Sequence, residues 1–267
     1  MPADCAAVLP EAVWEQVWVK PGSEVWQVDT SAGGRYVKIA GGAEQAQLDD
    51  EAHRLEWAHG RLPVPTPEVL ARAHGADDRS WLVTAALEGV PAHDPGWRVD
   101  RVEAMVEGVG AGLRRLHDTD PAACPFRIGV EDLLASATER VAAGGVDPTS
   151  MASPTYRRHD AESLLDHLRA TRPVEPAADL VVAHGDAVLP NVLLRPPPSR
   201  QDGAVITGLV DLGRLGVSDR YRDLALVARS LVLNVGPEPA WRLFDAYGLP
   251  HPDPLRMEWY ALADDMW

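Results

Sequence analysis

The feature that most constrains this chain is a polar motif that runs from His184 to Asn191 and is followed by Asp211-Leu212-Gly213. The first motif places Asp186 and Asn191 at a fixed spacing, and the second adds another carboxylate. Asp and Asn are common in ordinary turns, and a lone His-x-Asp would be explained in that way. The additional Asn191, and an Asp-x-Gly at the distance of a hairpin, favour one shared site that the fold must assemble.

The chemistry of these residues suits the transfer of a phosphoryl group. Asp186 would position an acceptor hydroxyl and remove its proton, and orientation is the larger contribution because the transition state is loose. Asn191 and Asp211 would hold Mg²⁺, which binds proteins through one or two carboxylates together with substrate phosphates. His184 is expected to brace the loop rather than to exchange protons.

A lysine and a glutamate in the N-terminal part complete this chemistry. Lys38 lies in a strand predicted at 35–39, and Glu51 lies in a helix predicted at 43–59. In kinases a strand lysine contacts the α- and β-phosphates and is held by a helix glutamate. Alone, the pair would be a surface lysine and a solvated carboxylate. Together with the 184–191 motif, the functional interpretation is favoured.

The order of the predicted elements indicates an α+β fold with two lobes. Strands with one helix fill the first 85 residues, and helical periodicity dominates after residue 97. We expect a nucleotide-binding lobe at 1–86, a catalytic and acceptor-binding lobe at 87–267, and a nucleotide between them. The predicted strands are 25–29, 35–39, 69–71, 81–84 and short pieces of 180–213; the predicted helices are 43–59, 102–116, 129–142, 160–171, 220–234, 238–247 and 253–265.

Composition narrows the range of partners. The 267 residues carry a formal net charge of −15 and show no basic stripe, which argues against nucleic acid. No apolar run is long enough to cross a bilayer, and the two cysteines, Cys5 and Cys124, make no disulfide framework. We expect a cytoplasmic protein, a monomer or weak dimer, that has a small-molecule partner and neither a membrane nor a nucleic-acid partner.

A long run around Asp211 makes the resemblance to one family specific. It reads GLVDLGRLGVSDRYRDLA over residues 208–225. With the 184–191 motif it resembles the bacterial aminoglycoside phosphotransferases, and within them the 3'- and 3''-phosphotransferases. The resemblance covers nearly the whole chain and includes 115–117, 120–126 and the ending 264–267.

This resemblance implies a protein-kinase-like fold and an enzyme that phosphorylates an antibiotic hydroxyl with ATP or GTP, in resistance or self-protection. An aminoglycoside is the expected acceptor, and Mg²⁺ the expected metal. The resemblance supports Lys38, Glu51, Asp186, Asn191 and Asp211 in the roles given above.

Further site residues are implied by the same resemblance. Thr84 to Ala86 would be the hinge whose backbone meets the purine, and Ser23 would lie in the loop that covers the phosphates, although Pro-Gly before it is also a common turn. Asp264, Asp265 and Trp267, with the terminal carboxylate, would hold the amines of the drug; otherwise they would be a frayed tail. Arg214 and Arg229 belong to the same candidate substrate site.

Two departures from the family weaken the case for a polyamine acceptor. The segment 149–158 contains no acidic residue but holds Arg157 and Arg158, and Ser230 follows Arg229 where many 3'-enzymes have Asp. Recognition of amines rests on charge complementarity, so two sources of negative charge are missing. Either the drug is bound mainly by the acidic ending, or the acceptor is a less cationic antibiotic, such as a nucleoside or peptide type.

Two further classes of function remain as alternatives. The chain could be a metabolic small-molecule kinase of the same fold that acts on a sugar or an amino alcohol. It could also be a silent nucleotide-binding module, which is disfavoured because each catalytic position holds a competent residue.

Overall fold

The computed structural model describes residues 5, 9, 12–75, 78–97, 101–197 and 203–267. Its contacts divide the chain into two compact units. The first unit comprises Met1–Gly89 together with Thr207–Gly213, and the second comprises Val90–Ile206 and Arg214–Trp267. Packing thus joins the segment that contains Asp211 to the N-terminal unit, which the linear order of the sequence does not reveal. The functional division at residue 86 remains a prediction.

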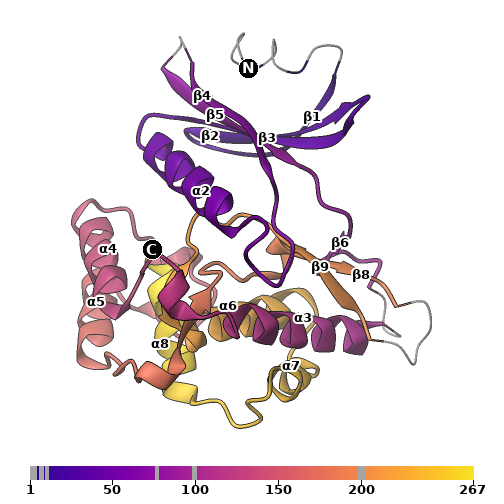
Figure 1. The fold of residues 1–267 in the computed structure, drawn as a ribbon. Helices are drawn as coiled ribbons and strands as arrows, with labels where there is room; N and C mark the ends of the chain where they lie inside the picture. Colours follow the sequence, from indigo (N-terminus) through magenta and orange to yellow (C-terminus); the bar gives the residue numbers. More distant parts are fainter. Residues whose placement is uncertain (1–4, 6–8, 10–11, 76–77, 98–100, 198–202) are drawn as a thin grey trace. The chain divides into compact units, whose positions relative to one another are not determined.

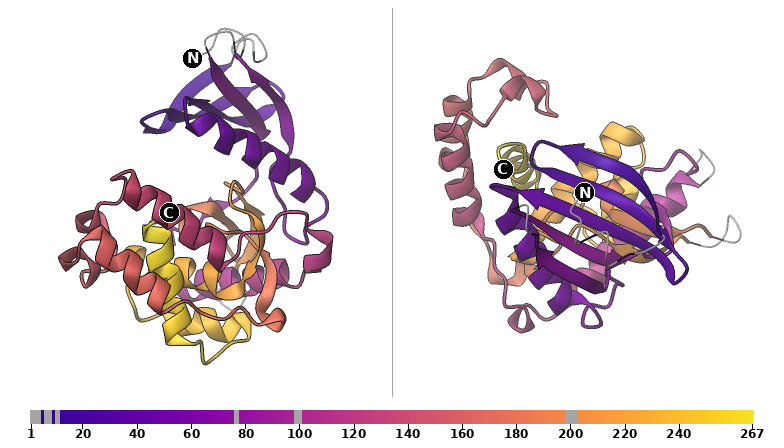
Figure 2. Two further views of the ribbon diagram at one scale, coloured as in Figure 1. Left: turned by 90° about the vertical axis from the view of Figure 1, so that its left-hand side faces the viewer. Right: turned by 90° about the horizontal axis from the view of Figure 1, so that it is seen from above.

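In the described part of the first unit, a five-stranded antiparallel sheet in the order β1-β2-β3-β5-β4 carries a long helix on one face (Figures 1 and 2). Its strands are β1 (Val13–Lys20), β2 (Ser23–Thr30), β3 (Gly33–Gly41), β4 (Val69–His74) and β5 (Arg79–Ala85). Val28, Val37, Ile39, Trp81 and Val83 form a core with Cys5. Because side chains alternate along β3, Lys38 points away from the face that carries Val37 and Ile39.

The helix of the first unit is α2 (Glu44–Ala58), which contacts β3, β4 and β5. Its buried positions, Leu48, Glu51, Ala52, Leu55 and Ala58, recur at helical spacing. A single carboxylate among apolar residues on this face must have a partner, because an unpaired buried charge is costly. The helix ends before a segment rich in proline, because proline has no backbone N–H donor and cannot continue a helix.

The second unit is mainly helical. Its helices are α3 (Val102–His117), α4 (Val130–Ala142), α5 (Ala161–Ala170), α6 (Arg220–Asn234), α7 (Ala240–Tyr247) and α8 (Pro254–Asp265). Helix α3 packs along α7, α6 along α8, and α4 beside α5 (Figure 1). The helices α4, α5, α6 and α8 share one hydrophobic core, which includes Leu134, Leu168, Leu226, Trp259 and Leu262.

Short strands interrupt these helices and carry the polar motif. Strand β7 (Leu180–Ala183) pairs with β10 (Gly216–Asp219). The strands β6 (Val90–Pro91), β8 (Val192–Arg195) and β9 (Val205–Leu209) form a second small sheet in the order β6-β8-β9. The mixture of antiparallel sheet and helices is α+β, as the sequence predicts. In the described part of the chain, no helix has the length and apolar character to span a bilayer.

Helix ends account for the small differences from the predicted ranges. The helices predicted at 160–171 and 253–265 begin one residue later, at Ala161 and Pro254. Asp160 and Asp253 are instead the N-caps, and their carboxylates accept hydrogen bonds from the first helical amides. An N-cap satisfies a backbone donor that has no partner within the helix.

A glycine sets the approach of α3 to α7. A Cβ atom on Gly110 would lie 2.5 Å from the carbonyl oxygen of Leu243 and 3.0 Å from the Cβ of Ala246. Neither of these atoms belongs to the far end of a flexible side chain, so the two helices would have to move apart. The close packing of α7, which carries Tyr247, therefore depends on this glycine.

The substitution Gly110→Ala is expected to lower the free energy of unfolding by about 1–3 kcal/mol, because overpacking displaces α7. Helix propensity alone would give the opposite sign, since Ala is favoured over Gly by about 1 kcal/mol within a helix. Chemical denaturation of the variant, beside Ala111→Ser at the adjacent exposed position, measures the change. A stabilised Gly110→Ala protein would contradict the packing argument.

Candidate functional site

The polar motif forms a tightly wound loop between β7 and β8. Gly185 has a φ of +82°, and a Cβ atom there would lie 2.1 Å from the carbonyl oxygen of Arg214. This position therefore requires glycine. Beyond it, the carbonyl of Asp186 accepts hydrogen bonds from the amide of Val188 at 2.8 Å and from Nδ2 of Asn191 at 3.0 Å. The fixed spacing of Asp186 and Asn191 thus closes the loop on itself.

His184 lies at the base of this loop and is fully buried. Its Nδ1 accepts a hydrogen bond from the amide of Asp186 at 3.2 Å, so the ring ties the motif to the start of the loop. This contact is of the bracing kind that the sequence predicts for His184.

The same loop is also held by Asp223, a buried carboxylate that the sequence analysis did not select. The two oxygens of Asp223, on α6, accept hydrogen bonds from the amides of His184 at 2.7 Å and of Gly185 at 2.8 Å. Nε2 of His117, at the end of α3, lies 2.9 Å from Oδ2 of Asp223. Burial would raise the pKa of Asp223, but the contact with His117 and the backbone donors hold it below its usual value.

His117 is itself fixed from the other side. Its Nδ1 lies 2.7 Å from the hydroxyl of Tyr247, on α7, and the two rings meet edge to face. Burial raises the pKa of Tyr247 to about 12, so the hydroxyl remains a donor to Nδ1. The imidazole then donates through Nε2 to Asp223. The sequence contained a signal for these contacts. His117 and Asp223 lie in the segments 115–117 and 208–225, which are two of the segments on which the family resemblance rests.

Lys38, Glu51 and Asp211 are brought together within the first unit. The Nζ of Lys38 lies 2.7 and 2.8 Å from the two carboxylate oxygens of Glu51 and 2.9 Å from Oδ1 of Asp211. Burial would lower the pKa of Lys38, but the two carboxylates outweigh it and raise the pKa above its usual value. Burial raises the pKa of Glu51 against the opposing effect of Lys38. The lysine is thus a fixed cation between two carboxylates.

The backbone at Asp211 presents its carboxylate to Lys38. Asp211 has a φ of +63°, a left-handed conformation that Asp tolerates better than most residues. On one side of it, the amide of Leu209 donates to the carbonyl of Pro65 at 3.0 Å. On the other side, Gly213 lies against Glu51, whose Cβ would be 3.6 Å from a Cβ at that position. These contacts anchor the segment to the first unit.

The remaining predicted nucleotide-site residues lie on strands of the same unit. Ser23 is the first residue of β2 and pairs with Lys20 and Ala40. Thr84 lies in β5. The amide of Ala86 donates to the carbonyl of Gly34 at 3.1 Å, so one of the hinge groups expected to meet a purine is engaged within the unit.

The predicted substrate-binding residues also lie together, in the second unit. Oδ1 of Asp264 lies 2.9 Å from Nη1 of Arg214, and its Oδ2 pairs with Nη2 of Arg229. Arg229 also pairs with Asp265 through Nη1, at 2.8 Å. The guanidinium of Arg214 stacks over the ring of Trp267 at 5.2 Å. The acidic residues expected to hold the amines of a drug are therefore already paired with arginines of the chain.

The two departures noted in the sequence have structural roles. Ser230 is buried, and its hydroxyl accepts a hydrogen bond from the amide of Leu189 at 3.0 Å, which supports the end of the loop formed by residues 184–191. Arg157 donates through Nε to the carbonyl of Met151 at 2.7 Å. Burial raises the pKa of the Asp265 carboxyl, and Arg229 and, to a smaller extent, Arg157 oppose this rise. Both positions add polar support but no negative charge.

Comparison with known proteins places this site in a family. The chain matches the phosphotransferase enzyme family over residues 19–260. It is 38% identical to an aminoglycoside 3'-phosphotransferase of Streptomyces fradiae, over 86% of this chain and 84% of that protein. It is 37% identical to a streptomycin 3''-kinase of Streptomyces griseus, over 87% and 84%. The structure of aminoglycoside phosphotransferase APH(3'')-Id from Streptomyces rimosus with ADP and streptomycin superposes with a TM-score of 0.80 at 29% identity, covering 98% of this chain and 95% of that one.

The fold and the site define a phosphotransferase of protein-kinase-like architecture that acts on an alcohol group. The chain belongs to the phosphotransferase enzyme family, and its predicted resemblance to the aminoglycoside 3'- and 3''-phosphotransferases is confirmed.

The substitution Lys38→Met is expected to lower kcat/KM for the nucleotide by about 100-fold, because it removes a fixed cation from the phosphate site. Lys20→Met is the matched control: Lys20 also lies in a strand, β1, and pairs with a residue of α2, Glu44, at 2.6 Å. Steady-state kinetics with varied nucleotide compares them. Equal losses in the two variants would show that the Lys38 pair has no special function.

The substitution His117→Leu is expected to lower kcat by about 10- to 100-fold while the KM for the nucleotide changes little, because Asp223 loses a donor and Asp186 is misplaced. Tyr247→Phe, which removes only the far hydroxyl, should have a smaller effect in the same direction. Steady-state kinetics on folded variants, checked by circular dichroism, gives the two parameters. An effect confined to thermal stability would contradict a positioning role.

Proposed function

We propose that this protein transfers the γ-phosphoryl group of ATP or GTP to a hydroxyl of an aminoglycoside antibiotic and thereby inactivates it. The observation that carries the proposal is the fixed loop that contains Asp186. The buried carboxylate of Asp223 holds this loop by accepting hydrogen bonds from two of its backbone amides. Two relatives that match 86% and 87% of the chain are an aminoglycoside 3'-phosphotransferase and a streptomycin 3''-kinase, which supports this acceptor class.

In this proposal Asp186 acts on the acceptor. Its carboxylate orients the hydroxyl oxygen toward the γ-phosphorus and accepts the hydroxyl proton as the new P–O bond forms and the bond from the γ-phosphorus to the leaving nucleoside diphosphate breaks. The tight loop favours this role, because effective positioning requires a carboxylate that is fixed before the substrate arrives.

Lys38 acts on the donor nucleotide. Its ammonium would contact the α- and β-phosphates, and Glu51 holds it there through both carboxylate oxygens. Ser23, the first residue of β2, would cover the phosphates, and the backbone from Thr84 to Ala86 would face the purine. The structure of the Streptomyces rimosus relative contains ADP, which supports a nucleotide cofactor here.

The residues present fit Mg²⁺ as the metal. Asp211 supplies a carboxylate whose side chain is 47% exposed, and the Asn191 side chain adds an amide oxygen. In the described residues, no cluster of three or more His, Cys, Asp or Glu could hold a metal by itself. Mg²⁺ usually binds through one or two carboxylates together with phosphates rather than in an all-protein cage. When bound, it would neutralise charge on the phosphates.

A second acceptor class is favoured by one specific observation. Asp264 and Asp265 are paired with Arg214 and Arg229, and Arg157 lies near Asp265, so the site holds less unmatched negative charge than its sequence suggests. A less cationic antibiotic, such as a nucleoside type, therefore remains the alternative acceptor. The same assay separates the two.

The wild-type protein is expected to transfer one phosphoryl group to at least one aminoglycoside in a panel that includes streptomycin, kanamycin and neomycin, as measured by mass spectrometry of the drug. The panel also contains nucleoside antibiotics, simple sugars and amino alcohols. Asp186→Asn, which keeps the size of the side chain, should lose turnover by about 100-fold or more, because the amide cannot accept the proton. Phosphorylation of a sugar but of no antibiotic would refute the proposal, and full turnover in Asp186→Asn would refute the role of Asp186.

A further inference from the structure

A buried arginine that takes no part in the pairs described above lies between the catalytic loop and the acidic ending. Arg222, on α6, is 3% exposed. Burial lowers its pKa to about 10, which leaves it protonated at neutral pH. Its charged neighbours include Asp186 and Asp264, so it lies close to the residue that would position the acceptor.

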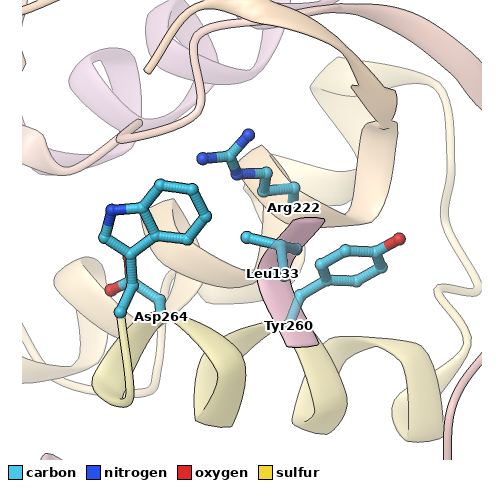
Figure 3. Close-up of a pocket in the computed structure, with 5 residues that line it drawn as sticks. Leu133, Arg222, Tyr260 and Asp264 are labelled. Atoms are coloured by element: carbon cyan, nitrogen blue, oxygen red, sulfur yellow. The ribbon is translucent and has the colours of Figure 1, made fainter. Parts of the chain in front are cut away.

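Arg222 has an unused donor. Among the described residues, no atom accepts a hydrogen bond from its Nη1. The hydroxyl of Tyr260 does not take this part, because it points to the opposite side from the guanidinium (Figure 3). A buried guanidinium N–H without an acceptor is costly, so a group from outside the described chain is expected to supply the missing oxygen.

A small pocket adjoins this donor. It is lined by Leu133, Arg222, Tyr260, Asp264 and Trp267, and its volume is about 10 Å³ (Figure 3). That volume fits about one water-sized group and is too small for a sugar ring. The guanidinium of Arg222 also lies over the ring of Trp267 at 5.5 Å, which fixes its plane beside the pocket. The pocket can therefore take one polar substituent of a larger ligand.

The local charges decide which substituent fits. The carboxylate of Asp264, which could have attracted an ammonium group, is engaged on one oxygen by Arg214 and on the other by Arg229. An ammonium group in the pocket would instead face the protonated Arg222, which has no lone pair to accept a hydrogen bond. A hydroxyl, ether or carbonyl oxygen would accept from Nη1.

We propose that Arg222 is a specificity-determining residue that binds an oxygen of the acceptor substrate next to the hydroxyl that is phosphorylated, and that it disfavours acceptors with an amino group at that place. This inference rests on the proposed function, because it deepens the description of the same acceptor site. It identifies the preferred substrates as aminoglycosides in which this position carries oxygen rather than nitrogen.

Matched drugs test the inference directly. Neomycin and paromomycin differ by one amino group replaced with a hydroxyl, and kanamycin B and kanamycin A differ in the same way at another position. Calorimetric titration of the wild-type full chain is expected to show at least one pair in which the hydroxyl form binds about 10-fold or more tightly, the size expected for a hydrogen bond to a charged group. Equal binding within both pairs, or tighter binding of the amino forms, would overturn the proposal and leave a water molecule as the occupant of the pocket.

Variants at Arg222 assign the preference. Arg222→Gln should bring the ratio of the two binding constants within the selective pair close to one. Arg222→Lys, which retains the charge, should reduce this ratio without abolishing it, and it serves as the test if Arg222→Gln does not fold. Arg242→Gln is the control, because Arg242 pairs with Glu103 and Glu107 on α3, and it should keep the wild-type ratio. A ratio that is unchanged in both Arg222 variants would overturn the assignment. These ratios come from binding, so a failure of phosphoryl transfer, which would refute the proposed function, is seen separately.

Discussion

The geometry of the loop at residues 184–191 depends on one buried carboxylate. Asp223 is fully buried and remains ionised because two backbone amides and the imidazole of His117 surround it. A charge in such a place would be strongly destabilising without these partners. The requirement acts in both directions: the carboxylate fixes the amides of His184 and Gly185, and these amides keep the carboxylate in one position. Asp186 follows directly in the chain, so its placement is a consequence of this balance.

The same carboxylate links distant helices to the loop. Asp223 belongs to α6, His117 ends α3, and Tyr247 ends α7, so three helices meet through one line of hydrogen bonds. The close contact at Gly110 brings α7 near enough to α3 for the hydroxyl of Tyr247 to reach the imidazole. The close packing of α3 against α7 is therefore connected, through Tyr247 and His117, to the backbone that positions Asp186.

Sequence patterns predicted the parts of this structure that are local and failed for contacts set by tertiary packing. The strand of Lys38 and the helix of Glu51 follow from alternation and helical periodicity, and the two residues pair in the structure. The position of Asp211 with the first unit could not be predicted, because it depends on packing against residues such as Pro65 that are far away in the sequence. The pairing of Asp264 with Arg214 and Arg229 was missed for the same reason. The sequence predicted all three as substrate-binding residues but did not show which charges cancel.

That cancellation changes how the acceptor site must be understood. A carboxylate that already binds a guanidinium on each oxygen attracts an incoming ammonium group much less than a free one does, because the newcomer must displace an equal charge and its hydrogen bonds. Counting acidic residues therefore overstates the affinity of this site for polyamines. Selection among acceptors must then rest on groups whose hydrogen bonds are not yet made, and Arg222 is such a group among the described residues. Its Nη1 can be satisfied by an oxygen and not by an ammonium group, so Arg222 would disfavour an amine at this place even though the protein as a whole is acidic.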